Sequence, residues 1–122
     1  MGKKILAIDD DVEMGMLIQM TLQSDGHEVR LAHSGSEGLE LAFQIRPDLI
    51  ILDIMMPGMD GFDVCKSLRE MLNSPILMLT AYSGEKEMLQ SFNTGADDFL
   101  GKPFSNNELR ARVRALLRRW EY

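Results

Sequence analysis

Aspartates stand at two places in the sequence where an apolar run ends. The run 5–8, ILAI, leads into Asp9 and Asp10. The run 49–52, LIIL, leads into Asp53. Carboxylates held close together repel one another, by about 4 kcal/mol for a pair about 4 Å apart at an effective dielectric constant near 20. If the two runs end side by side, the three aspartates predict a site for a hard cation such as Mg²⁺, which prefers oxygen ligands and often bridges carboxylates to phosphate oxygens.

A hydroxyl and a cation follow two further apolar runs. Thr80 comes directly after the run ILML, and Lys102 follows the short run DFL. Together with the aspartates they would complete a phosphate-sized pocket. Each residue also has an ordinary alternative, because Asp10 and Glu13 have the spacing of a capping box, Thr80 suits a turn, and a lysine before Pro103 suits a solvated surface. Their common placement at run ends favours the pocket.

The elements that would position these residues alternate between strand and helix. The continuous apolar runs 5–8, 49–52 and 76–79 are typical of central parallel strands, which are covered on both faces. The alternating segment 28–32 and the short segment 98–100 suit sheet edges. Helical periodicity lies between them and is weakest from Glu85 to Thr94, where only Met88, Leu89 and Phe92 form an apolar side.

This pattern predicts an α/β fold of the flavodoxin-like, doubly wound (βα)5 type, with a five-stranded parallel sheet of order 2-1-3-4-5 and helices on both faces. In such a sheet ligands bind at the carboxyl ends of the strands, where the strand order reverses. The aspartates of the first and third strands would therefore share one crevice.

Composition excludes several classes of protein. The chain has 122 residues, 45% of them hydrophobic, which suits one globular domain. Its net charge of −6 argues against nucleic-acid binding by the domain as a whole. The single cysteine cannot form an internal disulfide, and no apolar run approaches the roughly 20 residues of a membrane span. The first residues, MGKKILAIDD, reach aspartates too soon for the pattern of a signal peptide. We therefore expect a cytoplasmic protein with no membrane partner.

These motifs, in this order, resemble the response-regulator receiver domain of bacterial two-component signalling. The similarity runs through KKILAIDDD, LIILDIMMPGMDGFDVC, ILMLTAY and GADDFLGKPF, over essentially the whole chain. It implies that residues 1–122 form one receiver domain, a regulatory domain and not an enzyme. It also implies Mg²⁺ as cofactor and a sensor histidine kinase as the partner that donates the phosphoryl group.

The resemblance gives the site residues their roles. Asp53 would accept the phosphoryl group, and Asp9 and Asp10 would hold Mg²⁺ together with Asp53 and the backbone carbonyl of Met55. Bulky Met55 and Tyr82 would flank the path of a hydrolytic water, so self-dephosphorylation is expected to be slow.

The switch residues follow from the same resemblance. Thr80 and Lys102 would contact the phosphoryl group, Phe99 would rotate inward on activation, and Pro103 would follow a cis peptide bond. The signal would pass through the surface of the fourth helix, fifth strand and fifth helix.

The ending GADDFLGKPFSNNELRARVRALLRR resembles the subfamily joined to winged-helix DNA-binding domains, which control transcription. It implies a homodimer on phosphorylation, and DNA contact only through an output domain absent from this chain. Met88 departs from the subfamily, which usually has a basic residue there. The candidate inter-subunit ion-pair residues are Asp97, Asp98, Glu108, Arg112 and Arg119.

The fifth helix also carries Arg110, Arg114 and Arg118 at i, i+4 spacing. A solvated face or a dimer interface explains this stripe better than contact with nucleic acid. No winged-helix segment follows residue 122, and the arginine-rich end favours a piece of a longer regulator over a natural single-domain protein.

Two other functions use related folds. A phosphatase of the haloacid-dehalogenase type also uses an aspartate nucleophile with Mg²⁺, but it needs a second aspartate where this chain has Met55. A flavin-binding module needs a hydroxyl-rich phosphate loop, whereas the segment DDDVEM would repel phosphate unless a metal intervened.

Overall fold

A computed structural model describes residues 2–56, 58–81 and 84–119, so Tyr82 lies outside the described residues. Strands and helices alternate through these ranges, as the sequence predicts. The elements are β1 (Lys4–Ile8), α1 (Val12–Gln23), β2 (Glu28–Ala32), α2 (Gly35–Ile45), β3 (Leu49–Asp53), α3 (Gly61–Met71), β4 (Ile76–Thr80), α4 (Glu85–Asn93), β5 (Asp98–Gly101) and α5 (Asn106–Arg119).

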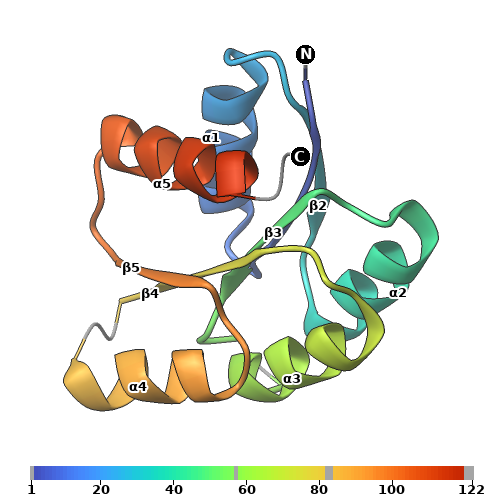
Figure 1. Cartoon of the computed structure of the whole chain (residues 1–122), viewed down its shortest axis with the longest axis vertical. Helices are drawn as coiled ribbons and strands as arrows, with labels where there is room; N and C mark the ends of the chain where they lie inside the picture. Colours follow the sequence, from blue (N-terminus) through green and yellow to red (C-terminus); the bar gives the residue numbers. More distant parts are fainter. Residues whose placement is uncertain (1, 57, 82–83, 120–122) are drawn as a thin grey trace.

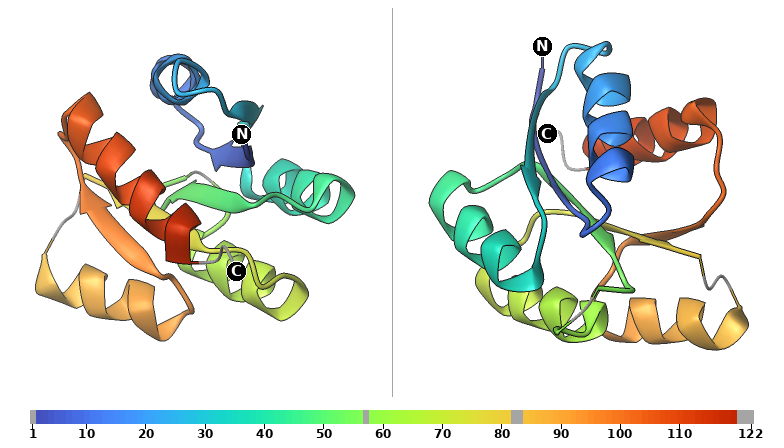
Figure 2. Two further views of the ribbon diagram at one scale, coloured as in Figure 1. Left: turned by 45° about the horizontal axis from the view of Figure 1, so that its top comes forward. Right: turned by 180° about the vertical axis from the view of Figure 1, so that it is seen from behind.

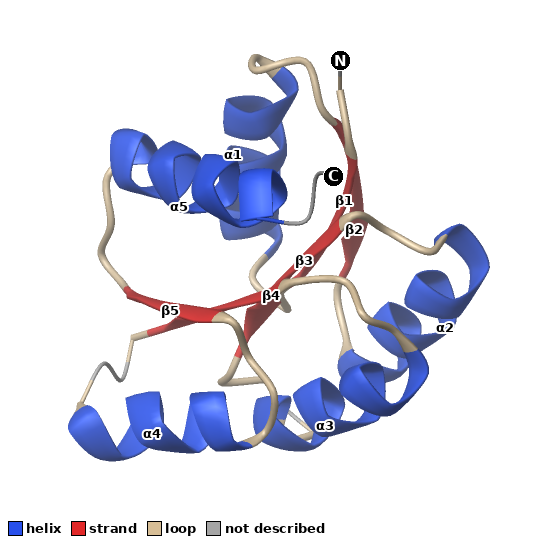
Figure 3. Cartoon of the chain, viewed as in Figure 1, coloured by secondary structure: helices blue, strands red, loops and turns tan. Residues whose placement is uncertain are grey.

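The five strands form one parallel sheet of order β2-β1-β3-β4-β5, which confirms the predicted topology. Helices α1 and α5 cover one face of the sheet, and α2, α3 and α4 cover the other (Figure 1). Figure 3 shows the strands as a twisted central layer between these two sets of helices. None of the helices in the described ranges is long and apolar enough to cross a membrane.

Alternate residues of the central strands supply the two cores. Leu6 and Ile8 of β1 pack toward the face of α2 and α3, whereas Ile5 and Ala7 pack toward α1 and α5. Every residue of β3 and β4 is buried, because helices cover both faces of these strands. The continuous apolar runs therefore identified the central strands correctly.

Helix α1 begins one residue later than a capping box starting at Asp10 would require. Its N-cap is Asp11, whose Oδ1 accepts hydrogen bonds from the N–H groups of Glu13 and Met14 at 3.1 and 3.2 Å. The capping alternative for Asp10 is therefore wrong. Because Asp11 satisfies the helix end, Asp10 remains exposed at the edge of the sheet.

Helix α4 contributes few buried side chains. Its only buried residue is Ser91, whose Oγ donates to the carbonyl of Glu87 at 2.9 Å. The expected apolar side is largely in solvent, since Met88, Leu89 and Phe92 are 37%, 51% and 43% exposed. The sequence predicts this helix as the one with the weakest apolar pattern, and in the structure it approaches the sheet through the small residue Ser91.

Candidate functional site

The strand register brings the aspartates together. Ile8 pairs with Leu52 across β1 and β3, so Asp9 and Asp53, the next residue of each chain segment, meet at the carboxyl edge. Carboxylate oxygens of Asp9, Asp10 and Asp53 all lie within 4.8 Å of one another. Asp9 and Asp53 are buried, and Asp10 is exposed. The three aspartates thus meet at one edge of the sheet, as the strand order predicts.

Lys102 lies between the two buried carboxylates. Its Nζ is 3.4 Å from Oδ2 of Asp9 and 3.5 Å from Oδ2 of Asp53. The pairing of β4 with β5 aligns Thr80 with Gly101, and the Lys102 N–H donates to the Thr80 carbonyl at 2.7 Å. Thr80 is fully buried at the end of β4. The hydroxyl residue and the cation thus reach the same edge of the sheet as the aspartates.

The pKa of Asp53 is raised from 3.8 to about 6, first by burial and then by repulsion from Asp9. Lys102 and the Met55 N–H, which donates to Oδ1 of Asp53 at 3.3 Å, act in the opposite direction on this pKa. One lysine therefore does not fully compensate the buried negative charge.

The donor set fits Mg²⁺. The three side chains offer carboxylate oxygens, which are the ligands that this hard cation prefers, and the exposed position of Asp10 leaves room for retained waters. A second positive charge at this place would relieve the repulsion that acts on Asp53.

The raised pKa has a consequence for stability in metal-free protein. Between about pH 4 and pH 6 the folded chain still binds a proton on Asp53 that the unfolded chain has lost, so the free energy of unfolding falls as the pH rises through this window. Asp53→Asn removes this penalty. We expect the variant to exceed the native chain in stability by up to about 3 kcal/mol at pH 7 and by little at pH 4, in urea unfolding with EDTA.

Asp60→Asn is the matched control for this experiment. Asp60 is the exposed N-cap of α3, and asparagine caps a helix as well as aspartate does. A stability difference between native chain and Asp53→Asn that does not change with pH would contradict the assigned cause.

The other predicted site residues lie near this edge. Met55 is 52% exposed, two residues beyond Asp53. Phe99 is 9% exposed and packs in the core cluster on the side of α3. The peptide bond between Lys102 and Pro103 is cis.

The residues proposed for inter-subunit ion pairs have contacts within the chain. Asp97 pairs with Arg69 at 2.8 Å, and Asp98 pairs with Arg112 at 2.9 Å. The Glu108 carboxylate accepts from the Ser105 N–H at 3.4 Å, and the Ser105 hydroxyl accepts from the Glu108 N–H, as the predicted capping box requires. Arg119 is exposed.

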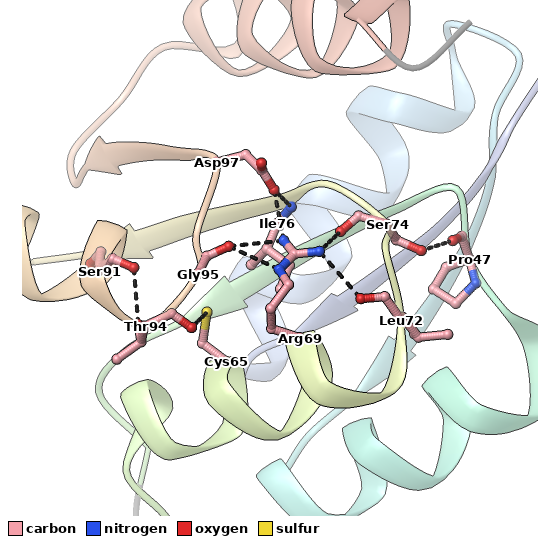
Figure 4. Close-up of polar contacts among 10 residues, drawn as sticks. All are labelled: Pro47, Cys65, Arg69, Leu72, Ser74, Ile76, Ser91, Thr94, Gly95 and Asp97. Carbon is pink, nitrogen blue, oxygen red and sulfur yellow. Dashed lines mark hydrogen bonds and ion pairs between the residues drawn. The ribbon is translucent and has the colours of Figure 1, made fainter.

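Arg69 is a residue that sequence reasoning missed. From α3, its guanidinium donates to the carbonyls of Gly95, Leu72 and Ser74 and to the Asp97 carboxylate (Figure 4). The same Asp97 oxygen accepts from the Ile76 N–H at 2.9 Å. This network, which we call the Arg69 clamp, joins the α3–β4 and α4–β5 connections. No local sequence signal distinguishes Arg69 from other charged helix residues.

The fold and the acidic crevice define a class of protein, the receivers of two-component signalling. The model of the response regulator receiver domain family matches residues 5–114, and the chain belongs to this family. Among individual proteins, it is 48% identical over 122 residues to the alkaline phosphatase synthesis transcriptional regulatory protein PhoP of Bacillus subtilis (strain 168). The match covers 99% of this chain and 51% of PhoP, so the chain spans about half the length of that relative.

Solved structures show the same fold. A two-component response regulator from Clostridium difficile is 34% identical with a TM-score of 0.94, and the match covers 98% of each chain. The receiver domain of the Francisella response regulator 1452 is 34% identical with a TM-score of 0.93, over 98% of this chain and 100% of that one. The BeF3-activated receiver domain of Klebsiella pneumoniae RstA is 36% identical with a TM-score of 0.90, over 94% and 98%.

Proposed function

We propose that this receiver domain is a switch that accepts a phosphoryl group on Asp53 from a sensor histidine kinase in a Mg²⁺-dependent reaction. The observation that carries the proposal is the buried Asp53 carboxylate, which ends a fully buried strand and has Lys102 Nζ at 3.5 Å and two further carboxylates beside it. A rigid strand end holds the nucleophile in place, which phosphoryl transfer requires more than covalent assistance.

Each residue of the crevice has a task in this reaction. An oxygen of Asp53 bonds to phosphorus as the bond from phosphorus to the donor nitrogen breaks. Asp9, Asp10, Asp53 and the Met55 carbonyl would hold Mg²⁺, which when bound neutralises charge on the phosphoryl oxygens. The Lys102 ammonium would move from the bare carboxylates to a phosphoryl oxygen, which carries more negative charge.

The switch would work by the same charge change. The phosphoryl group adds acceptor oxygens that would draw the Thr80 hydroxyl and Lys102 toward Asp53, and Phe99 would occupy the space behind Thr80. The sparse burial of α4 supports its role as the element that moves, because few core contacts hold it in one position. The signal would leave through the surface of α4, β5 and α5.

The wider role rests on the relatives. PhoP of Bacillus subtilis is called a transcriptional regulatory protein, and we infer that this chain also controls transcription, as a regulatory domain and not an enzyme. It would act in the cytoplasm as a homodimer when phosphorylated, and DNA contact would come through an output domain outside residues 1–122.

Incubation with acetyl phosphate tests the proposal. Intact mass spectrometry is expected to show one phosphoryl adduct with Mg²⁺ and none with EDTA. An adduct that forms equally with Mg²⁺ and with EDTA would contradict the proposed Mg²⁺-dependent reaction.

Removal of one metal ligand gives a separate prediction. Saturating Mg²⁺ is expected to stabilise the native chain, by about 2.7 kcal/mol when its concentration is 100 times the Kd. Asp9→Asn should lose most of this gain, because a charged ligand is replaced by a neutral one. Thermal unfolding with and without Mg²⁺ measures the effect, and Asp60→Asn should keep the full gain. An equal gain in Asp9→Asn would exclude Asp9 as a ligand.

A further inference from the structure

A second polar pocket lies far from Asp53, at the amino edge of the sheet. It has a volume of about 150 Å³ and lies between α5, the chain before β1 and the turn between α1 and β2. Helices α1 and α5 lie side by side on this face (Figure 2). The polar residues that line the pocket are Lys3, Asp25, His27, Arg110, Arg114 and Arg118.

The pocket concentrates positive charge. Among the described residues that line it, one lysine and three arginines accompany a single carboxylate, Asp25, in a chain whose net charge is −6. Arg110, Arg114 and Arg118 are like charges at i, i+4 spacing, which destabilises a helix. Stabilisation of the helix dipole explains only Arg118, in the last turn of α5. An anion in the pocket would relieve the repulsion along the whole stripe.

Contacts with the α1–β2 turn fix part of the pocket. The Arg110 guanidinium donates to the Ser24 hydroxyl at 2.9 Å. Its Nε is buried without a hydrogen bond, although Oδ2 of Asp25 lies 3.4 Å away. Arg114 and Arg118 are exposed and form no ion pair within the described ranges of the chain. Among the described residues, the pocket thus has one guanidinium held by the turn and two arginines without an ion-pair partner.

Backbone geometry positions Lys3 and His27, which line the side of the pocket opposite α5. The Lys3 N–H donates to Nδ1 of His27 at 3.1 Å, so the neutral His27 ring carries its proton on Nε2 and retains a donor. A Cβ at Gly2 would overlap the Gly26 carbonyl oxygen. Only glycine permits this close passage, which brings Lys3 and His27 next to each other.

We propose that this pocket binds a small multivalent anion of the phosphate class, such as inorganic diphosphate. Guanidinium groups recognise phosphate oxygens through paired hydrogen bonds. The volume is smaller than the roughly 300 Å³ at which pockets for drug-sized ligands begin, and it suits a phosphate or diphosphate group better than a whole nucleotide. The pocket lies at the opposite edge of the sheet from Asp53 and shares no lining residue with the proposed phosphorylation site.

Titration with sodium diphosphate tests the site. The buffer is freed of divalent metals by resin, because EDTA is itself a multivalent anion. Calorimetry is expected to show one saturable site, and backbone amide NMR signals should shift at His27 and along Arg110–Arg118. Asp53→Asn should bind equally well, which separates this test from the proposed phosphorylation.

The variants define which residues bind. Arg114→Gln combined with Arg118→Gln should weaken diphosphate binding at least about tenfold. A tenfold loss is near the lower limit of the effect expected when one hydrogen bond to a charged group is removed. Lys66→Gln combined with Arg30→Gln removes the same charge from exposed residues outside the pocket and should bind like the native chain. Thermal unfolding checks that both double variants are folded.

Two further probes complete the test. Adenosine diphosphate is compared with inorganic diphosphate. If the two bind with equal affinity, the site is assigned to the inorganic anion, and if adenosine diphosphate binds more tightly, it is assigned to the phosphate end of an organic molecule. Both results support the proposal. No saturable binding of diphosphate at millimolar concentration, or equal loss in the two double variants, would overturn it. So would binding of a DNA duplex that diphosphate does not displace.

Discussion

Replacement of Asp53 with asparagine is expected to abolish the phosphoryl adduct that acetyl phosphate forms in the presence of Mg²⁺. An amide is a much poorer nucleophile than a carboxylate, and the variant also removes one of the three clustered carboxylates. Intact mass spectrometry of the native chain and Asp53→Asn, after equal incubation, measures the effect. The adduct should fall below detection in the variant, which is the largest change that we expect from any single substitution.

Asp60→Asn is the matched control for this prediction too. Asp60 lies in the same loop region, caps α3 through Oδ1 at 2.8 Å from the Phe62 N–H, and is not one of the clustered carboxylates. The control should form the adduct at the native level. An adduct that persists in Asp53→Asn would place the acceptor on another residue, which peptide mapping would then identify.

The second large effect concerns the Arg69 clamp. Arg69→Met is expected to lower the free energy of unfolding by about 3 kcal/mol, because it removes hydrogen bonds to three carbonyls and leaves the Asp97 carboxylate without its cation. Methionine retains much of the side-chain volume, so the loss is mainly polar. Urea unfolding followed by circular dichroism measures the change.

Lys66→Met provides the control, since Lys66 is exposed on the same helix and should change stability by less than about 0.5 kcal/mol. Asp97→Asn and the double variant Arg69→Met with Asp97→Asn complete a double-mutant cycle, which gives the coupling energy between the two side chains. Because the Arg69–Asp97 contact lies within one chain, its coupling energy should not depend on protein concentration. A coupling that grows with concentration would instead support the inter-subunit role that the sequence suggests for Asp97.

The sequence by itself determined which segments become strands and where the reactive groups fall along the chain. Continuous apolar runs identify β1, β3 and β4, because central parallel strands are covered on both faces and need apolar residues at every position. Since the polar residues directly follow or end these runs, the alternation of strand and helix was enough to predict that Asp9, Asp53 and Thr80 share one edge of the sheet.

Only the tertiary structure decided how the side chains pair. The register that sets Ile8 against Leu52 places Asp9 beside Asp53, and the Lys102 ammonium is shared between those two carboxylates. Neither fact is encoded in local periodicity, because both depend on contacts between residues far apart in the chain.

The surface of α4 and the Arg69 clamp are two further features that local sequence patterns did not predict. Spacing showed Met88, Leu89 and Phe92 as the only apolar side of a weakly patterned helix, yet Ser91 is the residue that α4 buries. Asp97 is bound by Arg69, 28 positions earlier in the chain. Propensity and periodicity describe neighbours along a helix or strand, whereas the orientation of a helix on the sheet and the partner of a charge follow from packing of the whole chain.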